Sequence, residues 1–531
     1  MMAMRKIQIL CVGLAALWLA SCTDDKGNDS LSPINELEIS GIEDEYYNVG
    51  YKETLVIPVT LKGLLSGSDE NQFDYQWYLC NKEVTENAHK HTVISTEKDL
   101  EYPLDIPSGN YRLYFRATDK ETGMQWEKVT SLTVLSPFVR GFYLWGDKED
   151  GTCGMDFVSM IEGRDTTMMA DLFDNTVGLK KAGNIVFTGT YVATPHVVNL
   201  WATAENGAYS LEHSSSLEKF GVLEDVSLDK MVFPTLEVTR PLNFVDIVPH
   251  PYGSNNMNRA RSWRVLLTER DAFFCGSLLS SEAYGNPMNR YDANTSVLYK
   301  PSPYVFYQDN STYLQAVAFF DETNHCFTVQ NGASYAVTHT VKCTDSESPF
   351  WFDQNKYTPV RDLVYGENGF NGGYSYALMN DANGDYYIYK FKVNRYGPAG
   401  ISKSLARQVD KAVATDLDKA GHYTFFSMQP VILYAVGADL WAYDYVRNIA
   451  KKVATMDGEI TYLAMDAHSS NTPTDFIVAT YSESQKGTVY KYTIKDDPND
   501  IVVEPHTYHT ESYPWKTNLK VVKVEYRNSS L

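Results

Sequence analysis

Two long polar insertions carry the side chains best suited to contact an oligomeric ligand. They span 249–262 and 280–296, and loops of this length in a compact β fold are either functional or disordered. Phenol rings and guanidinium groups can stack on or hydrogen-bond the units of an oligomer. The candidate ligand-contact residues are Tyr252, Arg259 and Arg261 in the first insertion, and Tyr284, Arg290 and Tyr291 in the second. The alternative is that both insertions are plain surface loops.

A serine nucleophile on a sharp elbow requires the pattern Gly-x-Ser-x-Gly. The nearest matches, at 332–336 and 373–377, both end in alanine where the second glycine is required, and both lie within expected strands. We therefore expect neither Ser334 nor Ser375 to be catalytic, and we expect no catalytic residue and no enzyme activity.

Two further patterns suggest metal sites. His325 and Cys326 face His339 and Cys343 across a hairpin expected around 331–332, so four possible zinc ligands could converge there. Residues that alternate along a strand equally describe a packed β face, and the two cysteines could instead form a disulfide or stay as separate buried thiols.

The segment 381–385 superficially matches the start of an EF-hand loop. Positions six and twelve should be Gly and Glu, but they are Tyr386 and Lys392. Asn383 and Gly384 instead predict a hairpin turn between two strands. We therefore expect no metal and no cofactor.

Composition narrows the function classes. A chain of 531 residues suggests two to four domains, or fewer if one of them is a large all-β unit. The first 21 residues hold two cations, Arg5 and Lys6, and no acid, so their removal changes the net charge from −21 to −23. A chain this acidic should repel nucleic acid. Five cysteines besides Cys22 follow the leader, and an odd number argues against a disulfide framework.

Residues 1–21 have the form of a secretory signal. Arg5 and Lys6 precede a mostly apolar run over 7–19, which is too short to span a bilayer. The run ends in Leu19-Ala20-Ser21-Cys22, which resembles the lipobox of bacterial lipoproteins and implies cleavage before Cys22 and acylation of this cysteine. The alternative is an ordinary secretory signal with a chance cysteine.

A polar, breaker-rich tether follows over 22–33. The acidic residues directly after Cys22, Asp24 and Asp25, resemble the surface-export signal of Bacteroidetes lipoproteins. This resemblance implies an outer-membrane lipoprotein on the extracellular side, and a periplasm-facing orientation is the alternative.

Residues 34–137 predict an immunoglobulin-like β-sandwich, because six short alternating segments are separated by turn residues. Trp77 falls in mid-strand, where such folds bury a tryptophan, and Tyr111 has the setting of a tyrosine corner. Leu113 stands where an antibody domain carries its second cysteine. The expected strands are 37–42, 54–61, 73–79, 92–95, 111–118 and 125–134.

This stretch resembles the PKD-like domain of Bacteroidetes lipoproteins. The matching residues are Tyr75-Gln76-Trp77-Tyr78, Tyr111-Arg112-Leu113 and 118–123, and the resemblance continues into Gly141-Phe142-Tyr143-Leu144-Trp145. The Gly-Asp-Gly motif of the better-known PKD repeats is absent. The resemblance is expected to extend over essentially the whole chain.

Residues 138–531 predict a β-propeller of six to eight blades, with seven favoured. Units of strand, tight turn and aromatic-rich strand recur, as in 431–444 and 475–494. A pair of further sandwiches is the alternative. One segment departs from the pattern: Ile401, Leu405, Val409 and Val413 recur every four residues and suggest a short connecting helix.

Lipoproteins that resemble this chain are accessory components beside a SusC-like TonB-dependent transporter and its SusD-like lid lipoprotein. The resemblance implies an accessory subunit of a nutrient importer, which captures oligomeric cargo or stabilises the complex. Peptide is preferred over glycan, because nothing resembles a glycan-binding module. The alternatives are a cell-surface propeller hydrolase, a propeller that binds a siderophore-like or corrinoid-like chelate, and a propeller that only braces the transporter.

Overall fold

The computed structural model describes most of the chain, which divides into two compact units. The expected leader, the lipidated Cys22 and the tether lie outside the described residues. No helix within the described residues is long and apolar enough to cross a membrane. The described ranges are 36–49, 53–63, 69–82, 91–161, 163–190, 197–213, 219–250, 263–275, 283–309, 314–330, 337–369, 372–394, 400–467, 474–506 and 513–528.

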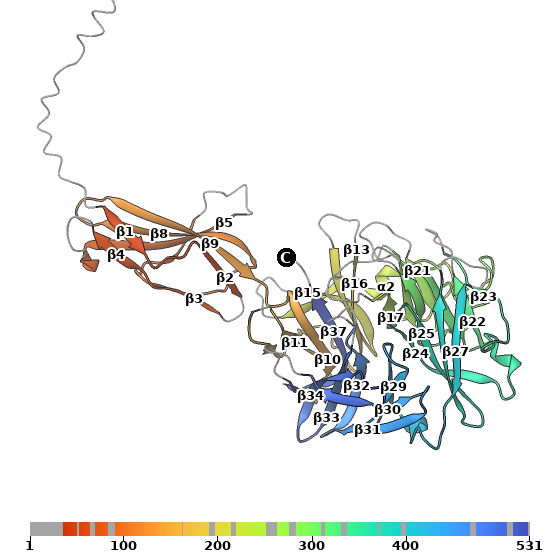
Figure 1. The fold of residues 1–531 in the computed structure, drawn as a ribbon. Coiled ribbons are helices and arrows are strands. Elements are labelled where there is room, and N and C mark those ends of the chain that lie inside the picture. Colours follow the sequence, from red (N-terminus) through yellow and green to blue (C-terminus); the bar gives the residue numbers. More distant parts are fainter. Residues whose placement is uncertain are drawn as a thin grey trace, which may run out of the picture. The chain divides into compact units, whose positions relative to one another are not determined.

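The first unit is a β-sandwich of short antiparallel strands (Figure 1). One sheet has the order β2-β9-β8-β5-β6, and two strand pairs, β1-β4 and β3-β7, complete the unit. The strands are β1 (Leu37–Ser40), β2 (Glu45–Val49), β3 (Thr54–Ile57), β4 (Thr60–Gly63), β5 (Phe73–Asn81), β6 (Thr92–Ser95), β7 (Leu100–Pro103), β8 (Gly109–Asp119) and β9 (Gln125–Leu135).

The sandwich core forms where the alternating pattern predicts it. Trp77 is fully buried in β5, its indole N–H donates to the carbonyl of Lys98 at 3.2 Å, and its ring lies 4.9 Å from that of Phe115. Tyr111 and Leu113 on β8 are buried as well. The expected immunoglobulin-like packing around Trp77 is therefore confirmed.

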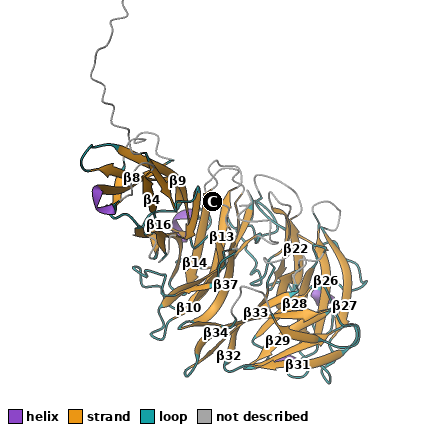
Figure 2. Ribbon diagram, turned by 60° about the vertical axis from the view of Figure 1, so that its left-hand side comes forward, coloured by secondary structure: helices purple, strands orange, loops and turns teal. Residues whose placement is uncertain are grey.

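The second unit is a β-propeller of seven sheets in the described residues (Figure 2). Neighbouring strands within these sheets are antiparallel, and consecutive strands form a meander in each blade except the first, which β37 completes. The strands are β10 (Arg140–Asp147), β11 (Cys153–Ser159) and β12 (Thr167–Met169) with β37 (Lys520–Asn528); β13 (Ala182–Thr190), β14 (Val197–Ala204), β15 (Gly207–His213) and β16 (Phe220–Ser227); β17 (Phe244–Val248), β18 (Arg264–Thr268) and β19 (Ala272–Cys275); β20 (Phe306–Asp309), β21 (Leu314–Asp321), β22 (Cys326–Gln330) and β23 (Val341–Lys342); β24 (Arg361–Asn368), β25 (Ser375–Asp381), β26 (Tyr386–Val393) and β27 (Ile401–Gln408); β28 (His422–Phe426), β29 (Val431–Val436), β30 (Asp439–Asp444) and β31 (Ile449–Thr455); β32 (Glu459–Met465), β33 (Asp475–Ser482), β34 (Lys486–Lys495) and β35 (Val502–Pro505), with β36 (Trp515–Thr517) beside β34. A single helical turn, α2 (Leu228–Met231), follows β16.

The last described strand closes the ring. β37 pairs with β10 over the full length of β10, so the first blade combines the beginning and the end of the propeller sequence. β37 also contacts β13 and β32, which are the first strands of the two neighbouring blades. The first strands of successive blades and β37 therefore surround the propeller axis.

A separate apolar cluster fills each boundary between neighbouring blades. On β10, Tyr143 and Trp145 pack toward the second blade, whereas Phe142 and Leu144 pack toward the seventh. Successive side chains of a strand point to opposite faces. Because both faces of a blade are covered, β10 is a continuous apolar run rather than an alternating one.

We expect the Gly146→Ala variant to destabilise the propeller at its closure. A Cβ atom on Gly146 would lie 2.2 Å from the carbonyl oxygen of Lys520 on β37, and backbone atoms cannot yield as a flexible side chain can. Overpacking of this kind typically costs about 1–3 kcal/mol. Gly221→Ala is the matched control, because a Cβ atom there has no neighbour within 4 Å. Chemical denaturation of both variants measures the difference, and equal unfolding free energies would contradict the expectation.

The segment expected to be a short helix is instead an edge strand. Residues Ile401–Gln408 form β27, which pairs with β26. The spacing of four residues does not correspond to one shared face: a register shift lies between Lys403 and Leu405, so Ile401 packs between the fourth and fifth blades and Leu405 between the fifth and sixth. The pattern alone did not separate the two structures, and the helix prediction was wrong.

One predicted hairpin is present, and the turn expected around 331–332 lies outside the described residues. Residues 381–385 form the turn between β25 and β26, where Gly384 has a φ of +70° and the Asp381 carboxylate accepts from the N–H groups of Asn383 and Asp385. β22 and β23 form the arms of the second hairpin. Cys326 on β22 and Cys343, directly after β23, are separate buried thiols, as are the other three described cysteines.

Candidate functional site

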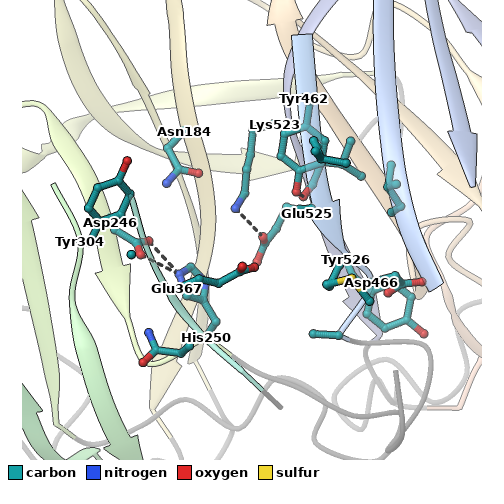
Figure 3. A pocket seen from close by; sticks show the side chains of 18 of the residues that line it. Asn184, Asp246, His250, Tyr304, Glu367, Tyr462, Asp466, Lys523, Glu525 and Tyr526 are labelled. Atoms are coloured by element: carbon teal, nitrogen blue, oxygen red, sulfur yellow. Dashed lines mark hydrogen bonds and ion pairs between the residues drawn. The ribbon is translucent and has the colours of Figure 1, made fainter. Parts of the chain in front are cut away.

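A cavity of about 360 Å³ lies within the ring of inner strands. Its wall combines residues of β13, β17, β24, β32 and β37 with residues that precede or belong to β20. Because these strands come from six different blades, the cavity lies on the propeller axis. The wall is apolar and aromatic in part, but it also contains an unusual set of ionisable groups (Figure 3).

Strand alternation places two of the charged groups. Lys523 and Glu525 lie two residues apart on β37 and so share one face, while Val524 between them lies in the apolar cluster between the seventh and first blades. Both charged side chains line the cavity (Figure 3).

Asp246 on β17 and His250 just after this strand form a close pair. The imidazole Nε2 of His250 lies 2.8 Å from one carboxylate oxygen of Asp246 and 2.9 Å from the other. Burial alone would raise the pKa of Asp246, but the neighbouring imidazole holds this pKa below its usual value. Burial would likewise lower the pKa of His250, but Asp246 raises it. Together these shifts favour an imidazolium–carboxylate pair.

Glu367 on β24 has neutral hydrogen-bond donors. The hydroxyl of Thr424 donates to Oε1 at 2.9 Å, and the backbone N–H of Phe425 donates to Oε2 at 2.5 Å. Burial raises the pKa of Glu367 to about 7, against the opposing effects of these hydrogen bonds, of a hydrogen bond from the Tyr365 hydroxyl and of the Lys523 charge. Glu367 therefore exchanges a proton near neutral pH.

Lys523 and Glu525 lie farther apart than a hydrogen bond. The ammonium nitrogen of Lys523 is 3.9 Å from Oε2 of Glu525. The Glu525 side chain is only 2% exposed, and its Oε1 accepts no hydrogen bond from the described residues. Burial would lower the pKa of Lys523, but the surrounding Tyr462, Glu525, Asp246 and Glu367 raise it, so this side chain stays charged.

Tyrosine rings complete the wall. Tyr304, Tyr365, Tyr462 and Tyr526 line the cavity, and the hydroxyls of Tyr304 and Tyr462 donate to backbone carbonyls of neighbouring strands. These hydrogen bonds fix the positions of two of the rings. Concave sites that combine aromatic walls with a few placed polar groups are typical ligand sites.

A second buried ionic group lies beside the cavity on the seventh blade. Lys491 on β34 is 3.1 Å from Asp466, which lines the cavity, and 3.7 Å from Asp475. The imidazole of His506 is 3.2 Å from Asp475. These groups neutralise one another inside the blade.

Three of the six sequence-predicted contact residues lie outside the described residues. The other three do not line the axial cavity. Tyr252, Arg259 and Arg261 lie outside the described residues. Tyr284 is 1% exposed and packs in the apolar cluster between the second and third blades. Arg290 is buried and donates to the carbonyls of Thr338 and Thr295.

Tyr291 is the third residue expected from the second insertion. It is half-buried, and its hydroxyl donates to the Asp321 carboxylate at 2.5 Å. The described residues of this insertion thus hold propeller segments together, and the expected role of all six residues in ligand contact stays a prediction.

Sequence reasoning missed the ionisable residues of the axial cavity. Asp246 interrupts the apolar run Phe244–Val248, and Lys523 and Glu525 interrupt 520–526. Charged residues inside an otherwise apolar strand are costly unless they are paired or functional. This pattern was visible in the sequence, but only the ring of blades shows that the three residues share one cavity.

A family model matches the first part of the chain. The model of the PKD-like family matches residues 22–184, which include the sandwich and the first strands of the propeller, but not the rest of the chain. No curated protein matches this sequence.

Several solved structures share a distant likeness. A quinonprotein alcohol dehydrogenase-like protein of Bacteroides thetaiotaomicron has 12% identity and a TM-score of 0.33, over 87% of this chain and 94% of that chain. Hsv2p of Kluyveromyces lactis has 8% identity and a TM-score of 0.35, over 69% and 96%. The Cps50 (Swd1) propeller domain of Myceliophteria thermophila has 8% identity and a TM-score of 0.33, over 65% and 94%. Likenesses this distant say nothing about activity.

Proposed function

We propose that this protein captures a small polar solute, or the end of an oligomer, in the axial cavity of its propeller, without chemistry of its own. The observation that carries this proposal is the cavity of about 360 Å³, with its tyrosine rings and buried ionisable groups. A propeller that served only as a brace would not need buried charges on its axis, because such charges cost stability.

The proposed site of action is the outer surface of the outer membrane, with Cys22 as the lipid anchor. The lipobox-like sequence supports this anchor, and the family match begins at the same cysteine. One acyl chain holds a protein only weakly, so a multiply acylated Cys22 would give the stable attachment that this role requires.

The proposed partners are a SusC-like TonB-dependent transporter and its SusD-like lipoprotein, with this protein as an accessory subunit. The PKD-like match over 22–184 supports the proposal, together with the resemblance to accessory lipoproteins. A peptide is the preferred cargo, because its end carries both hydrogen-bond donors and acceptors, and the cavity wall offers groups that complement both.

We expect the tagged full-length protein, extracted from outer membranes in mild detergent, to co-purify with a transporter and its lid lipoprotein in stoichiometric amounts. Mass spectrometry identifies both the partners and any small molecule retained in the cavity. The control is a Cys22→Ala variant, which should be released from the membrane and lose the partners. Recovery of the wild-type protein alone would contradict the accessory role and leave a free-standing binder.

A hydrolase is the second candidate, because Glu367 and Glu525 are carboxylates that face one cavity, and the pKa of Glu367 is about 7. A carboxyl group that exchanges its proton near neutral pH is suited to general acid–base catalysis. Incubation with peptide and oligosaccharide mixtures, followed by mass spectrometry, separates the two functions. Cleavage that the Glu367→Gln variant abolishes would establish the hydrolase, whereas intact substrates support capture.

A further inference from the structure

The cavity wall contains more carboxylates than cations to pair with them. The imidazole of His250 lies 2.8 Å from Asp246, and the ammonium group of Lys523 lies 3.9 Å from Glu525. Lys491, behind the wall, has Asp466 at 3.1 Å. The hydrogen-bond donors of Glu367 are the hydroxyls of Thr424 and Tyr365 and the backbone N–H of Phe425, all of them neutral. The wall therefore has one carboxylate more than its cations neutralise.

Glu525 gives an independent indication of a missing donor. Its carboxylate is almost completely buried, and Oε1 accepts no hydrogen bond among the described residues. Buried carboxylate oxygens normally have partners, because removal from water without a replacement hydrogen bond is costly. A ligand N–H group inside the cavity would supply this partner.

We infer that the axial cavity takes a ligand with a protonated amine, which donates to Glu525 and is neutralised by Glu367. This inference rests on the proposed capture function and names its ligand class. The rings of Tyr365 and Tyr462 line the same cavity, and the face of a tyrosine ring attracts a cation. A lysine side chain or a peptide amino terminus has the required chemistry, whereas an anionic ligand would meet an excess of carboxylates.

Proton release should accompany amine binding. The pKa of Glu367 is about 7, so this group is mostly protonated at pH 6 and mostly ionised at pH 8. A cation favours the ionised carboxylate, so affinity should rise roughly tenfold between these pH values, because a lysine amine keeps its proton throughout. The titratable groups that face Glu367 are Tyr365 on its own strand, Tyr376 on β25, Tyr304 before β20, Tyr462 and Asp466 on and after β32, Lys523 and Glu525 on β37, and Asp246 and His250 of the third blade.

His250 could contribute to the same pH dependence. Its pKa is raised, and loss of its proton at higher pH would also make the cavity more negative. The two contributions are separable, because a Glu367→Gln variant removes the proton of Glu367 and keeps that of His250.

The test is calorimetric titration of the full chain with two matched probes, Nα-acetyl-lysine amide and Nα-acetyl-norleucine amide. The second probe replaces the amine with a methyl group. We expect binding of the lysine probe alone, proton release in buffers of different ionisation enthalpy, and a roughly tenfold to hundredfold loss of affinity in Glu525→Gln and in Glu367→Gln. Glu367→Gln should also lose most of the pH dependence.

The control variant is Glu237→Gln, because Glu237 is exposed and does not line the cavity. It should bind like the wild-type protein. Thermal unfolding of each variant shows that it is folded, and the two cavity variants lie on different blades, so both need not fail together.

The possible outcomes separate the inference from the proposed function. Equal binding of both probes, or binding of tri-glutamate but not of the lysine probe, would overturn the amine inference and leave the capture function intact. Binding of calcium ions in competition with the lysine probe would also overturn it in favour of a metal site. If neither the probes nor a panel of peptides and oligosaccharides binds at millimolar concentration, both the inference and the capture function fail.

Discussion

A chain that ends at Leu519, and so lacks β37, is expected to have no folded propeller. The deletion removes the pairing partner of β10 and the buried side chains of Val521, Val524 and Tyr526. Full burial of three such side chains contributes on the order of 5–9 kcal/mol, which is comparable with the whole stability of a typical domain. The deletion also removes Lys523 and Glu525 from the cavity wall.

Circular dichroism in the near ultraviolet and limited proteolysis measure this loss. The sandwich has its own core around Trp77 and is expected to survive as a protease-resistant fragment. The matched control ends at Asn528 and keeps all of β37, so it should unfold like the full chain. A cooperative propeller transition in the chain that ends at Leu519 would show that closure by the last strand is dispensable.

An Asp466→Ala variant is expected to lose about 3–5 kcal/mol of unfolding free energy, because it leaves the ammonium group of Lys491 buried with a weaker partner. The Lys491 side chain is 1% exposed and lies 3.1 Å from Asp466, and the remaining carboxylate of Asp475 is 3.7 Å away. Guanidinium titration, followed by tryptophan fluorescence, measures the loss.

Two controls separate burial from the ion pair itself. The exposed pair Lys451–Asp500 has similar geometry but is about half exposed, so Asp500→Ala should cost at most about 1 kcal/mol. The double variant Asp466→Leu/Lys491→Met removes both buried charges and should recover much of the stability. If Asp466→Ala costs no more than Asp500→Ala, water must reach Lys491 and the argument from burial fails.

Local patterns predicted the architecture well, because each of them is decided within a few residues. Alternating segments located β5, β6, β8 and β9 of the sandwich, and the Asn-Gly turn before Asp385 located a blade hairpin. One expected strand of the sandwich was too long, because it contains a proline. The expected strand 54–61 is divided into β3 and β4 at Pro58, because proline cannot donate to a ladder.

The candidate site was not predictable in the same way, because its members are far apart in the chain. Asp246, Glu367 and Glu525 lie on three different blades, and only the radial arrangement brings them to one axis. The insertions around Tyr252 and Tyr284 drew attention because a long loop is a local feature. A single charged residue in an inner strand is a weaker local pattern, although it was the better indicator of the cavity.

Ring closure by β37 determines when the protein can first bind a ligand in its axial cavity. The hydrogen bond between Arg527 and the Tyr143 hydroxyl joins residues 384 positions apart, and contacts of such long sequence separation form slowly. During synthesis, β37 emerges after the other described strands, and it carries Lys523 and Glu525. The cavity therefore cannot exist in a nascent chain that still lacks β37, and ligand capture would report that the ring has closed.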